Sequence, residues 1–135
     1  MRFALIAILA GCSLASSERG VPLTVTATAR DRGVVLVADR PFGSVACSYR
    51  AAAQPVDSAK SYRMVWWAQC PDDAHCTASV RYGDSSRLVT NDGPAPLAPG
   101  VCYTCLLNGD DGGGDVSFAV AADGSVSRCD PNATP

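Results

Sequence analysis

The residues of this chain best able to do chemistry are its seven cysteines and its one histidine. Cys102 and Cys105 form a C-x-x-C motif, which supports redox chemistry where a helix N-terminus lowers the pKa of one thiol. A Pro-Gly pair precedes this motif and a Leu-Leu pair follows it, a pattern that indicates a strand instead. A structural zinc site needs two such half-sites, and the chain has one, with His75 and Cys76 as further ligands nearby. Redox or metal handling by Cys102 and Cys105 is therefore the least favoured of our hypotheses.

Three disulfides are the default expectation for the cysteines that remain when Cys12 is set aside. An even number of cysteines in an oxidising compartment indicates a disulfide framework. The six are Cys47, Cys70, Cys76, Cys102, Cys105 and Cys129. Cys70 and Cys76 flank a loop of turn-forming residues between two apolar runs, so we expect them to pair and to staple a hairpin.

The pairing of the remaining four follows from strand geometry. Cys102 and Cys105 are three positions apart on an expected strand, so they face opposite sides of it and should not pair with each other. We expect one of them to meet Cys129 near the C-terminus and the other to meet Cys47.

No grouping of residues predicts catalysis. Nothing resembles G-x-S-x-G, and His75 lies between cysteines in a loop, where a solvated turn residue is expected. Asp110, Asp111 and Asp115 lie in a glycine-rich segment whose carboxylates suit Ca²⁺, although a hairpin loop that could meet a partner explains them better. We therefore expect no enzyme, no cofactor and no resident metal.

Two adjacent tryptophans are the candidate binding residues. Alternation over residues 62–69 places Tyr62, Met64 and Trp66 on one face of a strand and Trp67 on the other. One indole belongs to the core. The second is either covered by residues 51–60 or exposed as a stacking platform for sugar or peptide.

Length and charge exclude several classes of protein. A chain of 135 residues supports one domain, and its net charge of −2 provides no basic surface for nucleic acid. A content of 47% hydrophobic residues is too apolar for a disordered chain.

The N-terminus has the features of an export signal. Arg2 precedes the apolar run 3–9, which is far too short to span about 30 Å of hydrocarbon. The following Leu9-Ala10-Gly11-Cys12 resembles the lipobox of bacterial lipoproteins. The resemblance implies cleavage before Cys12, acylation of that residue and anchoring in a membrane. Ser13 in the next position implies the outer membrane of a Gram-negative bacterium.

Hydrophobic period two dominates the rest of the chain and predicts an all-β fold. The expected strands cover residues 23–29, 34–38, 45–49, 62–69, 78–82, 101–107 and 116–120, and the turns 31–33, 39–41, 91–94 and 123–124. Seven or eight short strands with frequent turns indicate a disulfide-stapled sandwich. The domains are then a signal peptide over 1–11, an acylated cysteine and tether over 12–20, one β-sandwich over 21–130 and a tail over 131–135.

Three segments between residues 60 and 120 specify the sandwich further. Leu97-Ala98-Pro99-Gly100-Val101-Cys102-Tyr103 resembles the L-x-P-G-x-x-Y segment that enters strand F of fibronectin type III domains. That resemblance implies a tyrosine corner, in which the Tyr103 hydroxyl bonds backbone a few residues upstream. Residues 64–67 resemble a strand carrying the core Trp, and residues 78–84 resemble a strand ending in Tyr-Gly.

Together these segments resemble the immunoglobulin-like, fibronectin type III-like module at the N-terminus of purple acid phosphatases. Three expected strands precede Trp66 where that family has about one, which leaves the strand order open. The phosphatase activity is not implied, because its two-metal site needs several histidines. We therefore expect a non-enzymatic envelope lipoprotein that binds an unknown protein, or alternatively a polysaccharide, and no nucleic acid.

Overall fold

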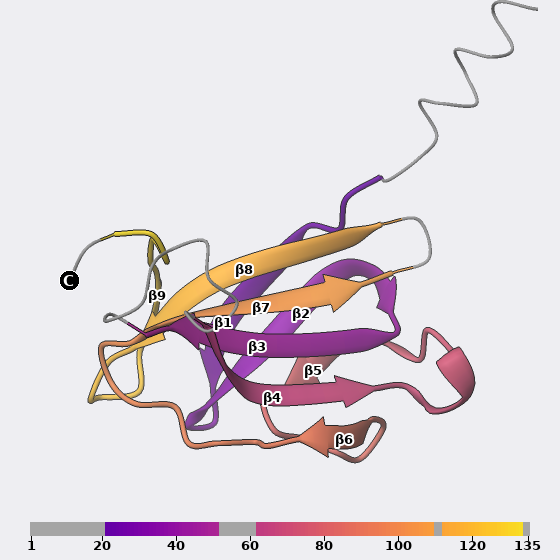
Figure 1. Cartoon of the computed structure of the whole chain (residues 1–135), viewed down its shortest axis with the longest axis horizontal. Coiled ribbons are helices and arrows are strands. Elements are labelled where there is room, and N and C mark those ends of the chain that lie inside the picture. Colours follow the sequence, from indigo (N-terminus) through magenta and orange to yellow (C-terminus); the bar gives the residue numbers. More distant parts are fainter. Residues whose placement is uncertain (1–20, 52–61, 110–111, 134–135) are drawn as a thin grey trace, which may run out of the picture.

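The computed structural model describes residues 21–51, 62–109 and 112–133 (Figure 1). Within these ranges the chain forms two antiparallel β-sheets. The strands in these ranges are β1 Val25–Arg30, β2 Gly33–Phe42, β3 Ser44–Arg50, β4 Tyr62–Gln69, β5 Thr77–Arg81, β6 Val89–Asp92, β7 Cys102–Asn108, β8 Gly113–Val120 and β9 Val126–Arg128. A short 3-10 helix, η2, covers Pro71–Asp73. Lipidation at Cys12 and the candidate loop residues Asp110 and Asp111 lie outside the described residues.

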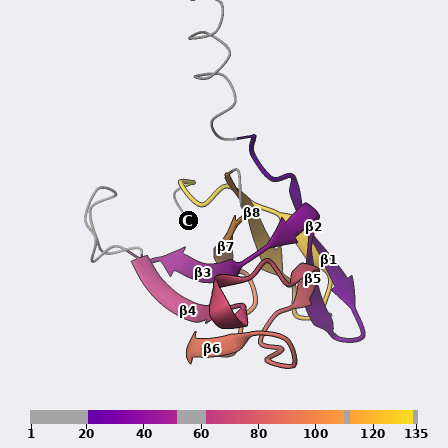
Figure 2. The ribbon, with the colours of Figure 1, turned by 90° about the vertical axis from the view of Figure 1, so that its right-hand side faces the viewer.

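The smaller sheet has the order β1-β2-β5 and the larger one the order β6-β4-β3-β7-β8-β9. Figure 2 shows β1, β2 and β5 as one layer beside the layer that contains β3, β4 and β6. The neighbours β1-β2-β5 and β3-β7-β8 match strands A, B, E and C, F, G of an immunoglobulin-like domain. The expected all-β sandwich is confirmed.

The core forms where the inner faces of the two sheets meet, because alternate residues of each strand are apolar. Its largest fully buried side chains are Trp66, Phe42, Phe118, Leu36 and Leu107. The Trp66 indole packs edge-on against the Tyr82 ring, with centroids 5.2 Å apart. The Tyr82 hydroxyl donates a hydrogen bond to the Ala95 carbonyl over 2.7 Å and so ties β5 to the segment after β6.

A register shift in β4 determines which tryptophan is buried. The pairing of β3 with β4 slips between Cys47 and Ser48, so that Val65 and Trp66 are both buried although they are adjacent. Simple alternation is therefore wrong for this strand, because the bulge reverses the phase. Met64 lies on the same outer face as Trp67, not with Trp66.

All three expected disulfides are present. Cys47–Cys105 joins β3 to β7, where the two residues face each other across the ladder with Cα atoms 4.0 Å apart. Cys102–Cys129 ties β7 to the segment after β9. As expected, Cys102 and Cys105 face opposite sides of β7, and Cys105 is the one that is fully buried.

Cys70–Cys76 also forms, but the hairpin expected between these residues is wrong. β4 belongs to the larger sheet and β5 to the smaller one, so the bridge closes a crossover around η2. The connection leaves one sheet and enters the other, whereas a β-hairpin joins two strands that pair within the same sheet. The disulfide thereby fixes the corner between the sheets.

Two short strands escaped prediction. Asn91 and Asp92 were expected in a turn, yet they belong to β6, which pairs with the edge strand β4. β9 pairs with β8 beyond the turn around Gly124. Both strands contain polar residues that are common at sheet edges and in loops alike. Composition alone therefore did not distinguish an edge strand from a loop at these positions.

The motif at residues 97–103 has the expected geometry. The Ala98 N–H donates a hydrogen bond to the Tyr103 hydroxyl over 2.7 Å, five positions upstream along the chain. The Tyr103 ring is buried and lies edge-on to Tyr49 with centroids 5.8 Å apart. This contact holds the turn that enters β7 against the core.

Candidate functional site

Exposed apolar side chains cross the outer face of the six-stranded sheet in one row. Trp67 pairs with Ala46 on β3, and Ala46 pairs with Leu106 on β7. Directly opposite residues in neighbouring strands point to the same side of the sheet. Trp67 is 43% exposed and Leu106 is 52% exposed, and large apolar side chains exposed next to one another form the kind of patch that marks a binding surface.

Small polar side chains flank this row on both sides. On one side Ser48 pairs with Met64 and with Thr104, and the Thr104 hydroxyl is 2.7 Å from that of Ser117. Met64 is 47% exposed and widens the apolar strip next to Trp67. Short side chains around an indole leave its ring face accessible to a flat partner.

On the other side of the row, the polar neighbours carry amides. Ser44 pairs with Gln69 on β4 and with Asn108 on β7. The Asn108 amide nitrogen donates to the Ser44 hydroxyl over 3.2 Å, and its carbonyl oxygen lies beside Gly113. Carboxylates terminate the row, because Asp92 pairs with Trp67 and Asp115 pairs with Leu106.

We call the surface formed by Ala46, Met64, Trp67 and Leu106 with its flanking polar side chains the Trp67 face. It combines an accessible aromatic ring with hydroxyl, amide and carboxylate groups on a sheet that the Cys47–Cys105 bridge cross-links. Such a surface can stack on the apolar face of a sugar ring or on apolar side chains of a protein, and can hydrogen-bond the partner at its rim.

The structure separates the residues that sequence reasoning grouped as candidates. Trp66 is fully buried, whereas Trp67 is exposed. Asp115 lies within β8, not in a loop, and joins the Trp67 face opposite Leu106. Leu106 and Met64 were missed, although Leu106 breaks the polar alternation of Thr104 and Asn108 and could have been found by that signal.

Cys102 and Cys105 do not form a dithiol redox pair. Cys102 and Cys105 are bonded to different partners, so they do not face each other as a redox pair. His75 lies in the loop before Cys76 and is partly exposed. Within residues 21–51, 62–109 and 112–133, no three His, Cys, Asp or Glu side chains gather as a metal-binding group.

The chain enters the sandwich at a well-anchored point. The Arg40 guanidinium donates to the carbonyls of Val21 and Pro22 over 2.9 and 2.8 Å, and the Leu23 N–H donates to Gly113. None of the helices in the described ranges is long and apolar enough to cross a membrane.

Comparison with known proteins supplied no relative. No family model matches the chain, and no curated protein or solved structure matches it at a significant level.

Proposed function

We propose that this chain is a bacterial envelope lipoprotein, acylated at Cys12, that catalyses no reaction and binds an envelope partner through the Trp67 face. The observation that carries the binding role is the exposed row of Trp67, Ala46 and Leu106 on a disulfide-bonded sheet. Two large apolar side chains exposed in one strip do not stabilise an isolated domain. A partner that covers them removes their apolar surface from water, and this burial favours binding.

The anchor is supported by the residue pattern Leu9-Ala10-Gly11-Cys12. Residues 13–20 would separate the acylated cysteine from the sandwich by at most about 25–30 Å when extended. A tether of this length holds the Trp67 face close to the lipid surface. Its partner is therefore a component of that surface or of the adjacent envelope.

A polysaccharide is the second candidate partner, and one observation favours it. The Trp67 ring is exposed beside an amide-bearing residue, Gln69, and next to the Asp92 carboxylate in the ladder. Aromatic stacking with hydrogen bonds from amides and carboxylates at the rim suits the apolar and polar faces of a sugar ring.

Mass spectrometry of the full-length chain extracted from membranes tests the anchor. A mass that includes acyl chains on Cys12 is expected, and Cys12→Ser should abolish both the added mass and the membrane fraction. Release of the wild-type chain without acylation contradicts the anchor.

Sedimentation with purified peptidoglycan sacculi tests the polysaccharide candidate separately. Trp67→Ala should reduce co-sedimentation about tenfold or more if the indole stacks on the glycan. Val37→Ser is the matched control, since Val37 is 40% exposed on the smaller sheet. Sedimentation that is equal in wild type and Trp67→Ala contradicts a glycan partner at this face and leaves the protein candidate.

A further inference from the structure

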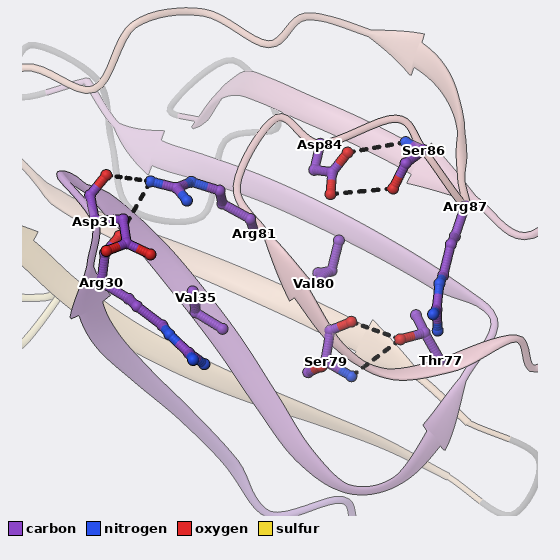
Figure 3. A pocket seen from close by; sticks show the side chains of 10 residues that line it. All are labelled: Arg30, Asp31, Val35, Thr77, Ser79, Val80, Arg81, Asp84, Ser86 and Arg87. Atoms are coloured by element: carbon purple, nitrogen blue, oxygen red, sulfur yellow. Dashed lines mark hydrogen bonds between the residues drawn. The ribbon is translucent and has the colours of Figure 1, made fainter.

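An open hollow of about 400 Å³ lies on the smaller sheet, and it carries three arginines (Figure 3). Arg30 ends β1, Arg81 ends β5, and Arg87 lies in the segment before β6. Arg30 is 51 positions from Arg81, and the two meet because β1, β2 and β5 form one sheet, while Arg87 follows on the same stretch of chain as Arg81. The carboxylates of Asp31 and Asp84 line the hollow as well, so the three arginines leave it with an excess of one positive charge in a chain whose net charge is −2.

Arg81 is held in place by the β1–β2 hairpin. Its Nη2 donates to the carbonyl of Arg30 over 3.1 Å and to the carbonyl of Asp31. The guanidinium lies directly over Gly33, where a Cβ atom would come within 2.6 Å of Nε. A guanidinium held in this way loses little conformational entropy on binding.

Arg30 and Arg87 are different, because their guanidinium groups make no hydrogen bond or ion pair with any residue in the described ranges. Both side chains are exposed, and Figure 3 shows them on opposite sides of the hollow with Ser79 between them. Arg87 acts on the Asp84 carboxylate only through its charge, without a close ion pair. Two separated guanidinium groups of this kind suit a ligand that carries an anionic group at each end.

The middle of the hollow offers groups that recognise hydroxyls. The exposed Ser79 lies there, and Asp84 lies at the edge. The Asp84 carboxylate accepts hydrogen bonds from the Ser86 N–H over 2.9 Å and from its hydroxyl over 3.2 Å. These bonds lower the pKa of Asp84 and fix the turn that leads to Arg87. A hollow of this volume accommodates a ligand of the size of a sugar.

We propose that this arginine hollow binds a sugar that carries two phosphate groups, with Arg30 pairing with one phosphate, Arg87 with the other, and Arg81 reinforcing the Arg30 side. Guanidinium groups bind phosphate through charge-assisted, paired hydrogen bonds. The Ser79 hydroxyl between them donates to or accepts from the sugar hydroxyls, and the Asp84 carboxylate at the edge accepts from them. The site is on the opposite sheet from the Trp67 face and does not depend on the function proposed for that face.

Isothermal titration of the full-length chain in nonionic detergent at low ionic strength tests this site. Fructose 1,6-bisphosphate is the two-ended probe and fructose 6-phosphate the one-ended control. Saturable binding of the bisphosphate, about tenfold tighter or more than that of the monophosphate, is expected. Equal affinities, or no saturable binding of either sugar, overturn the proposal.

A pair of charge-matched variants shows where the sugar binds. The double variant Arg30→Gln/Arg87→Gln should weaken bisphosphate binding about tenfold or more. The control Arg63→Gln/Arg128→Gln removes the same charge from the larger sheet. It should change bisphosphate binding less than about twofold. Trp67→Ala should leave it unchanged. Equal weakening by both double variants overturns the proposal, as does binding to phosphatidylglycerol vesicles in place of the bisphosphate.

Discussion

Trp66 and Trp67 are consecutive in the sequence, yet the first is fully buried between the sheets and the second is 43% exposed on the outer face. The bulge in β4 sets this division, because it places Val65 and Trp66 together on the inner side. Two residues of one chemical type therefore have opposite environments, one in the core and one on the surface for which we propose a binding role.

Stability should distinguish these two tryptophans. Trp66→Ala should lower the free energy of unfolding by about 3–5 kcal/mol, because it removes a fully buried ring from the core. Trp67→Ala should lower it by about 1 kcal/mol or less, since much of that ring is already in water. Guanidinium denaturation measures both changes. Similar losses for the two variants would mean that Trp67 is packed as firmly as Trp66.

Collisional quenching gives a second view of the same division. Iodide should quench about half of the tryptophan emission, the part due to Trp67, because the buried Trp66 is not accessible. Trp67→Phe should remove the quenchable part, and Trp66→Phe, a milder change than alanine, should leave it. Emission that resists iodide altogether would show that another part of the chain covers Trp67.

Tyr82 should ionise at unusually high pH. Burial, and to a smaller degree the proximity of Tyr103, raise the pKa of Tyr82 from 10.0 to about 12. The folded state thus disfavours the tyrosinate, so the stability that Tyr82 contributes is complete below pH 10 and declines as the pH rises from 10 towards 12. Absorbance at 295 nm should show a late ionisation step that is due to Tyr82. Tyr82→Phe should remove that late step, and its persistence in the variant would assign it elsewhere.

The disulfides should differ in their contributions according to the loops they close. Cys47–Cys105 closes a separation of 58 residues and Cys70–Cys76 one of six. By the chain-entropy model, removing the first disulfide should lower the free energy of unfolding by about 4 kcal/mol, and removing the second should lower it by about 2 kcal/mol. Paired alanine variants, Cys47→Ala/Cys105→Ala and Cys70→Ala/Cys76→Ala, test the order by denaturation. A larger loss for the shorter loop would show that fixing the corner at η2 matters more than loop entropy.

The β1–β2 hairpin offers a stabilising substitution. Asp31 and Arg32 form its two-residue turn with φ of 51° and 65°, the left-handed region that side chains disfavour. Arg32→Gly creates the favoured Asp-Gly turn and should raise the free energy of unfolding by about 0.5–1 kcal/mol. Arg32→Ala retains the strained conformation and serves as the control. A gain with alanine that equals the gain with glycine would attribute the effect to the lost charge.

Much of the fold was predictable from local pattern. Apolar patterning identified the strands from β1 to β5 and β7 and β8. The turn expected at residues 39–41 is wrong, because β2 continues to Phe42 with a register shift that accommodates Pro41. The opposite orientations of Cys102 and Cys105 excluded a bond between them, but did not decide which of the two meets Cys47 and which meets Cys129. The Tyr103 hydrogen bond was implied by the resemblance of residues 97–103 to a fibronectin type III segment. These features depend on neighbours in sequence or on the two-residue period of a strand.

The features that were not predicted depend on distant pairing. No local signal marks the bulge at Val65, which arises where β4 meets β3 and decides that Met64 lies beside Trp67. The arginine hollow unites Arg30, Arg81 and Arg87 through the order of the smaller sheet. The crossover at Cys70–Cys76 looked like a hairpin because its loop residues suit either connection.

Site-specific photo-cross-linking in intact cells tests the binding role of the Trp67 face most directly. A photoreactive phenylalanine analogue replaces Leu106 on that face, and the same analogue replaces Val37 on the smaller sheet as the control. We expect one defined adduct from position 106, lost when Trp67→Ala is added, and none from position 37. Adducts of equal yield at both positions, or none at position 106, would contradict a partner at the Trp67 face.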